Sequence, residues 1–182
     1  MRESTIARNY AEALFTIGEH DGDTERYADL MAGLAAAIAA EPRIRVTLES
    51  PRVPKPVKQQ LLERAMARHA PAPFIRFLAA VVKRGRQGML PAIADQYGAL
   101  VDDKFNRVHA GITLAREPDD RLKAAVQERL SAVFGKQVLP HFRTDPSILG
   151  GLIVRVGDRI MDGSLRRKMM ALKRQMLEGR GG

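Results

Sequence analysis

The chain has 182 residues and a mass of 20.1 kDa, which is enough for one domain or two small ones. It contains no cysteine, so disulfides, thiolate metal sites and a cysteine nucleophile are excluded. No apolar run approaches the roughly 18 residues of a membrane span, and the opening MRESTIARNYAE lacks the pattern of a secretory or transit peptide. We therefore expect the chain to stay in the compartment where it is made.

The net charge of +9 is distributed unevenly along the chain. Residues 1–105 carry 15 basic and 13 acidic side chains, whereas residues 106–182 carry 15 basic and 8 acidic ones. Such an excess attracts nucleic acid, anionic lipid or an acidic protein. It can equally be a solvated basic face without a specific partner, and charge alone leaves these interpretations open.

The first 105 residues have the apolar periodicity of helices almost throughout. Residues 44–48 alternate as a strand does, although five residues between two prolines also allow a short helix. The remaining segments predict helices at about residues 4–19 with Ser4 as N-cap, 23–41, 55–68 with Val57, Leu61, Ala65 and Met66 on one side, 74–83, and 90–105 with Phe105 on its buried side.

Two apolar stripes run side by side along the first helix. Together they cover about half of its circumference, which is more than one core requires. The helix is therefore either central in a bundle or shared with a second partner. The first stripe consists of Ile6, Tyr10, Ala13, Leu14 and Ile17, and the second of Ala7, Ala11, Phe15 and Gly18.

After Asn106 the pattern changes to mixed strands and helices. The expected elements are a strand at 108–114, a helix from Asp119 or Asp120 to Gly135 with Leu122, Val126, Leu130 and Val133 on one face, an edge strand at 138–142 because of Pro140, a hairpin at 152–161, and a final helix capped by Ser164. The sequence thus predicts a helical N-terminal domain, residues 1–105, and a small α/β C-terminal domain, residues 106–182.

Catalytic and cofactor motifs are missing from the sequence. The four histidines stand far apart without an H-x-x-x-H pair, no serine lies in a G-x-S-x-G elbow, and no glycine pattern forms a phosphate loop. We expect no catalytic residue, no metal and no cofactor, and the pattern favours a binding or scaffolding protein.

Two stretches resemble the delta subunit of F-type ATP synthase, which in mitochondria is the oligomycin-sensitivity-conferring protein. The segment 7–15, ARNYAEALF, is similar to the opening helix of that family. The segment 148–158, ILGGLIVRVGD, followed by DGSLR at 162–166, is similar to its C-terminal signature. Between them, Gly85-Arg86, Leu90-Pro91 and Tyr97 match the middle of the family pattern, so the resemblance covers essentially the whole chain in order.

This resemblance implies a mainly α fold: an N-terminal six-helix bundle that caps the catalytic head, followed by a small α/β domain that joins the peripheral stalk. The protein would be a non-catalytic stator element. It would lie at the cytoplasmic face of the bacterial inner membrane and reach the membrane only through the complex. Its partners would be alpha subunits of the head and b-type stalk subunits.

The resemblance also implies where the partners bind. A groove between the first and fifth helices would take an amphipathic N-terminal helix of an alpha subunit, with Ala7, Ala11 and Phe15 turned inward. The groove residues, carried over by position, are Ile6, Tyr10, Ala13, Leu14, Ile17, Phe77, Ala80, Val81 and Arg84. The stalk candidates are the basic residues of the last helix, Arg166, Arg167, Lys168, Lys173 and Arg174.

The alternative interpretation is a basic nucleic-acid-binding protein built from a helical bundle and a small α/β domain. It rests on the net charge of +7 in residues 106–182. A steep fall of affinity with salt would support it, because phosphate contacts are screened by ions. Association with ATP synthase subunits would support the stator instead, for which no nucleic-acid partner is expected.

Overall fold

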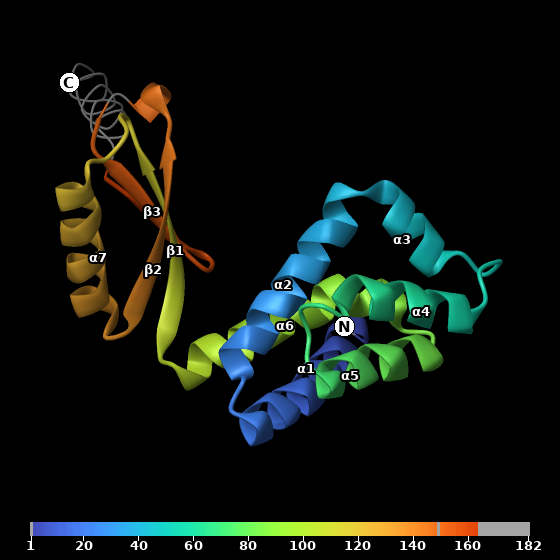
Figure 1. The fold of residues 1–182 in the computed structure, drawn as a ribbon. Helices are drawn as coiled ribbons and strands as arrows, with labels where there is room; N and C mark the ends of the chain where they lie inside the picture. Colours follow the sequence, from blue (N-terminus) through green and yellow to red (C-terminus); the bar gives the residue numbers. More distant parts are fainter. Residues whose placement is uncertain (1, 149, 164–182) are drawn as a thin grey trace, which may run out of the picture. The chain divides into compact units, whose positions relative to one another are not determined.

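The chain divides into a helical unit, Met1–Lys104, and an α/β unit, Phe105–Gly182, one residue before the expected boundary. The computed structural model describes residues 2–148 and 150–163 (Figure 1). It is mainly helical. The helical unit contains α1 (Arg2–Asp21), α2 (Thr24–Ala40), α3 (Pro42–Glu49), α4 (Lys55–Met66), α5 (Ala72–Lys83), the 3-10 helix η1 (Gln87–Met89) and α6 (Leu90–Lys104). The α/β unit contains β1 (Arg107–Leu114), α7 (Asp120–Phe134), β2 (Gln137–Thr144), the 3-10 helix η2 (Pro146–Ile148), β3 (Leu152–Val156) and β4 (Arg159–Asp162).

Two ends of the predicted helices differ from the structure. Helix α1 begins at Arg2, so Ser4 lies inside the helix and is not its N-cap. The segment 44–48, which could have been a strand or a helix, belongs to helix α3. Pro42 occupies the first turn of α3, where its missing N–H costs nothing, and the Glu41 carboxylate accepts a hydrogen bond from the Arg43 amide.

The core of the helical unit is built around aromatic residues on α2, α5 and α6. Tyr27, Phe74 and Tyr97 are fully buried. The Tyr27 and Phe74 rings meet edge to face with their centroids 5.3 Å apart, a favoured geometry for aromatic pairs. This ring pair joins α2 to α5, while α6 packs most extensively against both α1 and α2.

Of the side of α4 predicted to be apolar, only Met66 is buried. Leu62 and Met66 are buried together with Lys58, four residues apart on one side of the helix, whereas Val57 is 50% and Leu61 40% exposed. The long aliphatic stem of lysine can line apolar surface, so a charge at position 58 does not mark a solvent-facing position. Phe105 also differs, because it lies beyond the end of α6, is 40% exposed and packs on the Arg107 guanidinium.

The α/β unit has a four-stranded sheet in the order β2-β1-β3-β4. Strand β1 pairs with β2 in parallel through the α7 crossover, and with β3 antiparallel. Strand β2 is an edge strand that contains Pro140, as predicted, and β3 and β4 form the predicted hairpin. Helix α7 packs on one face of the sheet, where Ala110, Ile112 and Val138 are buried (Figure 1).

Both predicted ends of α7 are confirmed. The Asp119 carboxylate accepts a hydrogen bond of 2.7 Å from the Leu122 amide, and Gly135 ends the helix with φ of 62°. The predicted apolar face is only partly correct. Val126 is buried, while Leu122 is 42% and Val133 72% exposed, because the sheet contacts the side of the helix that also carries Leu130 and Phe134.

Replacing the cap of α7 should destabilise the α/β unit. We expect Asp119→Ala to lower the free energy of unfolding by about 1 kcal/mol, because the Leu122 amide loses its acceptor. The neighbouring Asp120 forms only an exposed ion pair with Lys123, so Asp120→Ala should cost less than about 0.5 kcal/mol. Urea unfolding of the two variants measures the difference, and equal losses would contradict the capping role.

Candidate partner-binding surfaces

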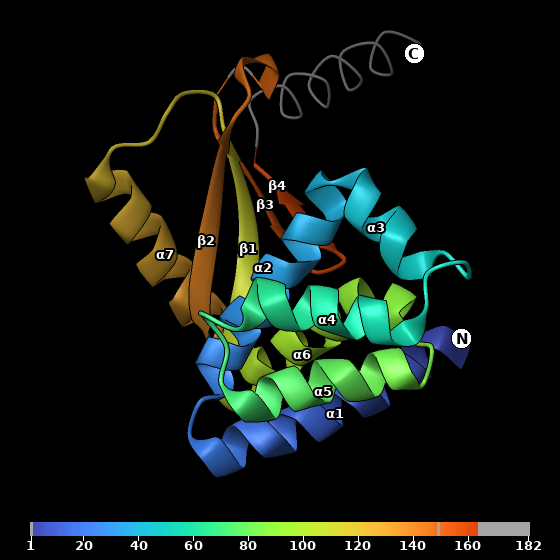
Figure 2. The same ribbon diagram turned by 45° about the vertical axis from the view of Figure 1, so that its right-hand side comes forward.

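Helices α1 and α5 lie side by side and run antiparallel (Figures 1 and 2). The Tyr10 ring on α1 meets the Phe77 ring on α5 edge to face, with centroids 6.4 Å apart. The two helices therefore present one continuous surface, which we call the α1–α5 surface. It comprises the nine residues that the resemblance assigns to the head contact: Ile6, Tyr10, Ala13, Leu14, Ile17, Phe77, Ala80, Val81 and Arg84.

These nine residues differ in how far solvent reaches them. Leu14, Phe77 and Val81 are buried in the core of the helical unit, so Leu14 and Val81 offer no exposed side chain to a partner. Ile6, Tyr10 and Ile17 are half-buried, and Ala13, Ala80 and Arg84 are exposed. The second stripe of α1 points the other way: Ala7 and Ala11 are fully buried, as predicted, and Phe15 is half-buried against the core.

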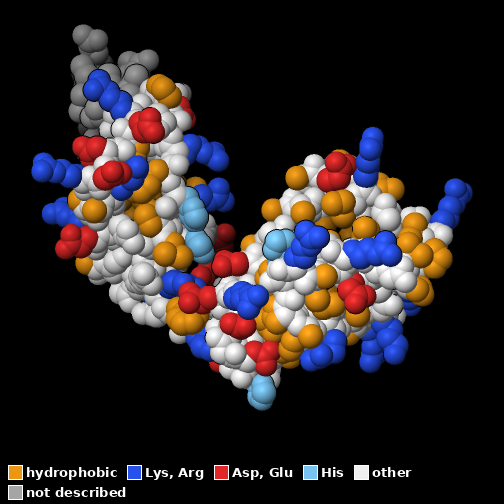
Figure 3. Space-filling model, in the orientation of Figure 1, with side chains coloured by type: hydrophobic (Ala, Val, Ile, Leu, Met, Phe, Trp, Pro, Cys, Tyr) orange, Lys and Arg blue, Asp and Glu red, His pale blue; other side chains and the backbone are white. Residues whose placement is uncertain are grey.

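Helix α1 thus has one face inside the core and a second apolar face that the described chain covers only in part. Figure 3 shows hydrophobic side chains at the surface of the helical unit. The exposed positions 13 and 80 are alanines, and small side chains at a contact allow helix axes to approach to the short end of the usual 8–10 Å range. The exposed Arg84, at the C-terminal end of α5, adds a positive charge beside the apolar residues.

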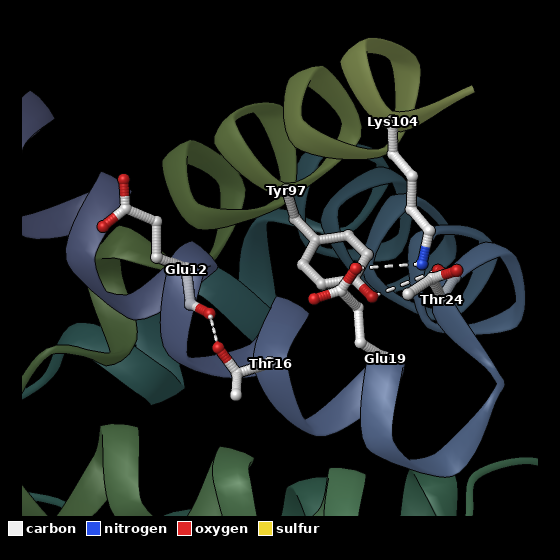
Figure 4. A network of polar contacts seen from close by, with 6 residues as sticks. All are labelled: Glu12, Thr16, Glu19, Thr24, Tyr97 and Lys104. Carbon is white, nitrogen blue, oxygen red and sulfur yellow. Dashed lines mark hydrogen bonds and ion pairs between the residues drawn. The ribbon is translucent and has the colours of Figure 1, made fainter. Parts of the chain in front are cut away.

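Polar contacts join α6 to the start of α2 and to the C-terminal half of α1 (Figure 4). Tyr97 on α6 donates a hydrogen bond of 3.1 Å to the backbone carbonyl of Thr24, which begins α2. Lys104 Nζ lies 3.1 Å from the Glu19 carboxylate and 5.5 Å from the centroid of the Phe15 ring. The α1–α5 surface is therefore carried by a helix that is fixed on its opposite side.

A second anchor joins the end of α1 to α2. Tyr27 donates a hydrogen bond of 2.7 Å to the Asp21 carboxylate, and this bond, followed by that from His20, lowers the pKa of Asp21. Burial, followed by the same bond to Asp21, raises the pKa of Tyr27 to about 12. Burial also raises the pKa of Tyr97.

These shifts predict a loss of stability in alkali. Tyr27 titrates near 10 when unfolded and near 12 when folded, so its contribution is present below pH 10 and is lost as the pH rises towards 12. We expect Tyr27→Phe to reduce the loss of unfolding free energy between pH 9 and pH 11, measured by urea titration. Tyr10→Phe, which removes a hydroxyl from the α1–α5 surface and not from the core, is the control. An equal pH dependence in both variants would contradict the assignment.

An apolar depression, which the sequence did not reveal, lies between α2 and α4. Its volume is about 320 Å³, and its lining includes Leu30 and Leu34 from α2 and Leu61 and Ala65 from α4. The periodicity of α4 indicated an apolar side but placed it in the core. Because Leu61 is 40% exposed, part of that side lines a surface depression instead.

The basic residues of the predicted last helix, Arg166, Arg167, Lys168, Lys173 and Arg174, lie outside the residues that the structure describes, as does its predicted cap Ser164. The prediction that they bind the stalk therefore stays a prediction. In residues 2–148 and 150–163, no three His, Cys, Asp or Glu side chains come together as they would around a metal ion. No helix in the same part of the chain is long and apolar enough to cross a membrane.

Comparisons with known proteins agree along nearly the full length of the chain. The family model of the ATP synthase delta (OSCP) subunit matches residues 6–176. ATP synthase subunit delta of Gemmatimonas aurantiaca is 46% identical over 172 residues, which are 94% of this chain and 93% of that protein. Subunit delta of Desulfotalea psychrophila is 31% identical over 181 residues, which are 99% of each chain.

A solved structure has the same fold at low sequence identity. A chain in the cryo-EM structure of the Toxoplasma gondii mitochondrial ATP synthase hexamer superposes with a TM-score of 0.68 and 19% identity, covering 94% of this chain and 97% of that one. The alternative of a nucleic-acid-binding protein is not supported by these matches. The chain belongs to the ATP synthase delta (OSCP) family and is a structural, non-catalytic subunit of that complex.

Proposed function

We propose that the chain links the catalytic head of ATP synthase to its peripheral stalk. The helical unit, for which the family resemblance implies a six-helix bundle, holds the N-terminal helix of an alpha subunit on the α1–α5 surface. The α/β unit binds the b-type stalk subunits. The protein stays at the cytoplasmic face of the bacterial inner membrane through these contacts and resists the torque that the rotor applies to the head.

The observation that carries the head contact is the double apolar face of α1. Ala7 and Ala11 complete the core, whereas Tyr10 and Ile17 remain half-exposed beside α5. Burying such apolar area contributes about 25 cal/mol per Å², so an amphipathic helix laid along this surface would gain free energy from side chains that the fold itself leaves uncovered. That arrangement is helix-in-groove recognition.

The stalk contact is supported by charge. The net charge is +7 in residues 106–182 and +2 in residues 1–105. A basic surface fits an acidic partner segment. The basic residues 166–174 are one candidate for this contact.

The experiment is a co-purification from native membranes with a tagged full-length chain, probed for alpha and b-type subunits. We expect the wild-type chain to retain both subunits. We expect an Ile17→Asp variant to lose the alpha subunit and to keep the b-type subunit, because the substitution buries a charge at the head contact. Arg129→Glu on the exposed side of α7 is the control for a change in charge. Retention of neither subunit by the wild-type chain would contradict the proposed link.

A further inference from the structure

One face of the four-stranded sheet is not covered by any described element of the α/β unit. Helix α7 packs on the face that carries Ala110, Ile112, Val138 and Val154. Because side chains alternate along a strand, the register places the intervening residues together on the opposite face. This open face consists of His109, Gly111, Thr113, Leu139, His141, Arg143, Ile153, Arg155, Ile160 and Asp162.

A glycine stands at the centre of the open face. Gly111 is paired with His141 on one side and Arg155 on the other, and a hollow of about 480 Å³ lies over these residues. Glycine weakens the interior of a strand, and it usually marks a bulge, a bend or a close approach by another group.

The fold itself does not require this glycine. The pairing of β1 with β2 runs without a bulge from Arg107 to Leu114, and Gly111 is not among the residues with positive φ. A Cβ atom at position 111 would lie 3.9 Å from its nearest neighbours, which is an ordinary contact. The remaining reason for a glycine is that another molecule approaches the backbone here.

The side chains around the hollow indicate the chemistry of that molecule. Arg143 and Arg155 are exposed and form no ion pair within the described part of the chain. Beside them His109 and His141 stack, with Nδ1 of the first 2.8 Å from Nε2 of the second. Figure 3 shows histidine and Lys or Arg side chains next to one another on the side of this unit away from α7.

The open face also has an apolar part. Ile160 is 60% exposed, and with the half-buried Ile153 it borders the hollow next to Arg155. The phosphate backbone of a nucleic acid would make no favourable contact with these two apolar side chains. An amphipathic helix would place apolar residues against them and carboxylates beside Arg143 and Arg155.

We propose that the open face binds an amphipathic helix that carries carboxylates along its contact side. Its apolar residues lie on Ile153 and Ile160, its backbone approaches Gly111, and its carboxylates pair with Arg143 and Arg155. The inference rests on the proposed function, in that this helix belongs to the stalk subunit that the α/β unit holds. It assigns the contact to the sheet and not to the basic residues 166–174.

The test measures the affinity of the full-length chain for the soluble segment of its cognate b-type subunit by calorimetry. Gly111→Val should weaken binding at least tenfold, because the side chain fills the hollow. Its melting temperature should be unchanged or higher, because valine suits a strand better than glycine. Arg155→Glu and Arg143→Glu should each weaken binding at least fivefold, whereas Arg129→Glu, with the same change in charge on α7, should have no effect.

The outcomes separate this inference from the proposed function. If the wild-type chain binds the b-type segment and Gly111→Val binds equally well, the open face is not the contact, although the stalk link stands. If the wild-type chain does not bind the segment, both fail. If a short DNA duplex binds as tightly as the segment and Gly111→Val abolishes both, the partner is a nucleic acid and the inference is wrong. It is also wrong if a chain ending at Gly163 no longer binds the segment, because the contact then needs residues beyond the sheet.

Discussion

Ala13→Leu should weaken the binding of a peptide copying the alpha N-terminus at least tenfold, about 1.4 kcal/mol, while the melting temperature of the full-length chain stays nearly unchanged. Ala13 is exposed on the α1–α5 surface, between the half-buried Tyr10 and Ile17. A leucine there adds bulk where the partner helix should approach, and it displaces no core residue. Leucine is also nearly as good a helix former as alanine.

The matched variant two residues earlier should behave in the opposite way. Ala11 is fully buried on the second stripe of α1. Ala11→Leu forces extra methylene groups into a packed core, which typically costs about 1–3 kcal/mol of stability. A thermal melt and a peptide titration on each variant separate the two roles. If Ala13→Leu unfolds the chain and Ala11→Leu only blocks the peptide, the two faces of α1 are assigned the wrong way round.

Gly18→Ala should lower the stability of the helical unit by about 1–3 kcal/mol, although alanine is the better helix former by roughly 1 kcal/mol. A Cβ atom at position 18 would lie 2.7 Å from the Tyr97 hydroxyl and 3.2 Å from the Tyr27 ring. It would also lie 3.3 Å from the Cα atom of Thr24. The added methyl group therefore pushes Tyr97 away from the Thr24 carbonyl that it contacts, and it separates α1 from the start of α2.

Gly33→Ala on α2 is the control for this variant. No atom lies within 4 Å of a Cβ built at Gly33, so alanine should stabilise the chain there by up to about 1 kcal/mol through helix propensity alone. The two Gly→Ala changes are thus expected to shift the melting temperature in opposite directions. A stability of Gly18→Ala equal to or above that of the wild type would show that α1 does not need this close approach.

Local rules predicted those parts of the fold that depend on neighbouring residues. Asp119 and Gly135 bound α7 because a cap and a left-handed residue act within one helical turn. Pro140 placed β2 at an edge because a missing N–H cannot serve an inner strand. The two stripes of α1 were predictable in part: Ala7 and Ala11 point into the core at helical spacing, but Leu14, assigned to the other stripe, is fully buried as well.

Features that depend on distant residues could not be predicted in the same way. The close approach at Gly18 involves Tyr97, which is far away in the chain, and no local pattern signals it. The His109–His141 pair and the hollow over Gly111 depend on the register of β1 with β2, which periodicity does not specify. The buried side of α4 includes Lys58, and a buried lysine looks like a solvent-facing position in sequence.

The central claim is that one chain holds the head and the stalk at the same time. Native mass spectrometry of the full-length chain with the alpha N-terminal peptide and the soluble segment of the b-type subunit tests it most directly. The account predicts a ternary complex with one copy of each component, in which Ala13→Leu removes only the peptide and Gly111→Val removes only the b-type segment. Binding of one component that excludes the other, or no binding of either component, would contradict it.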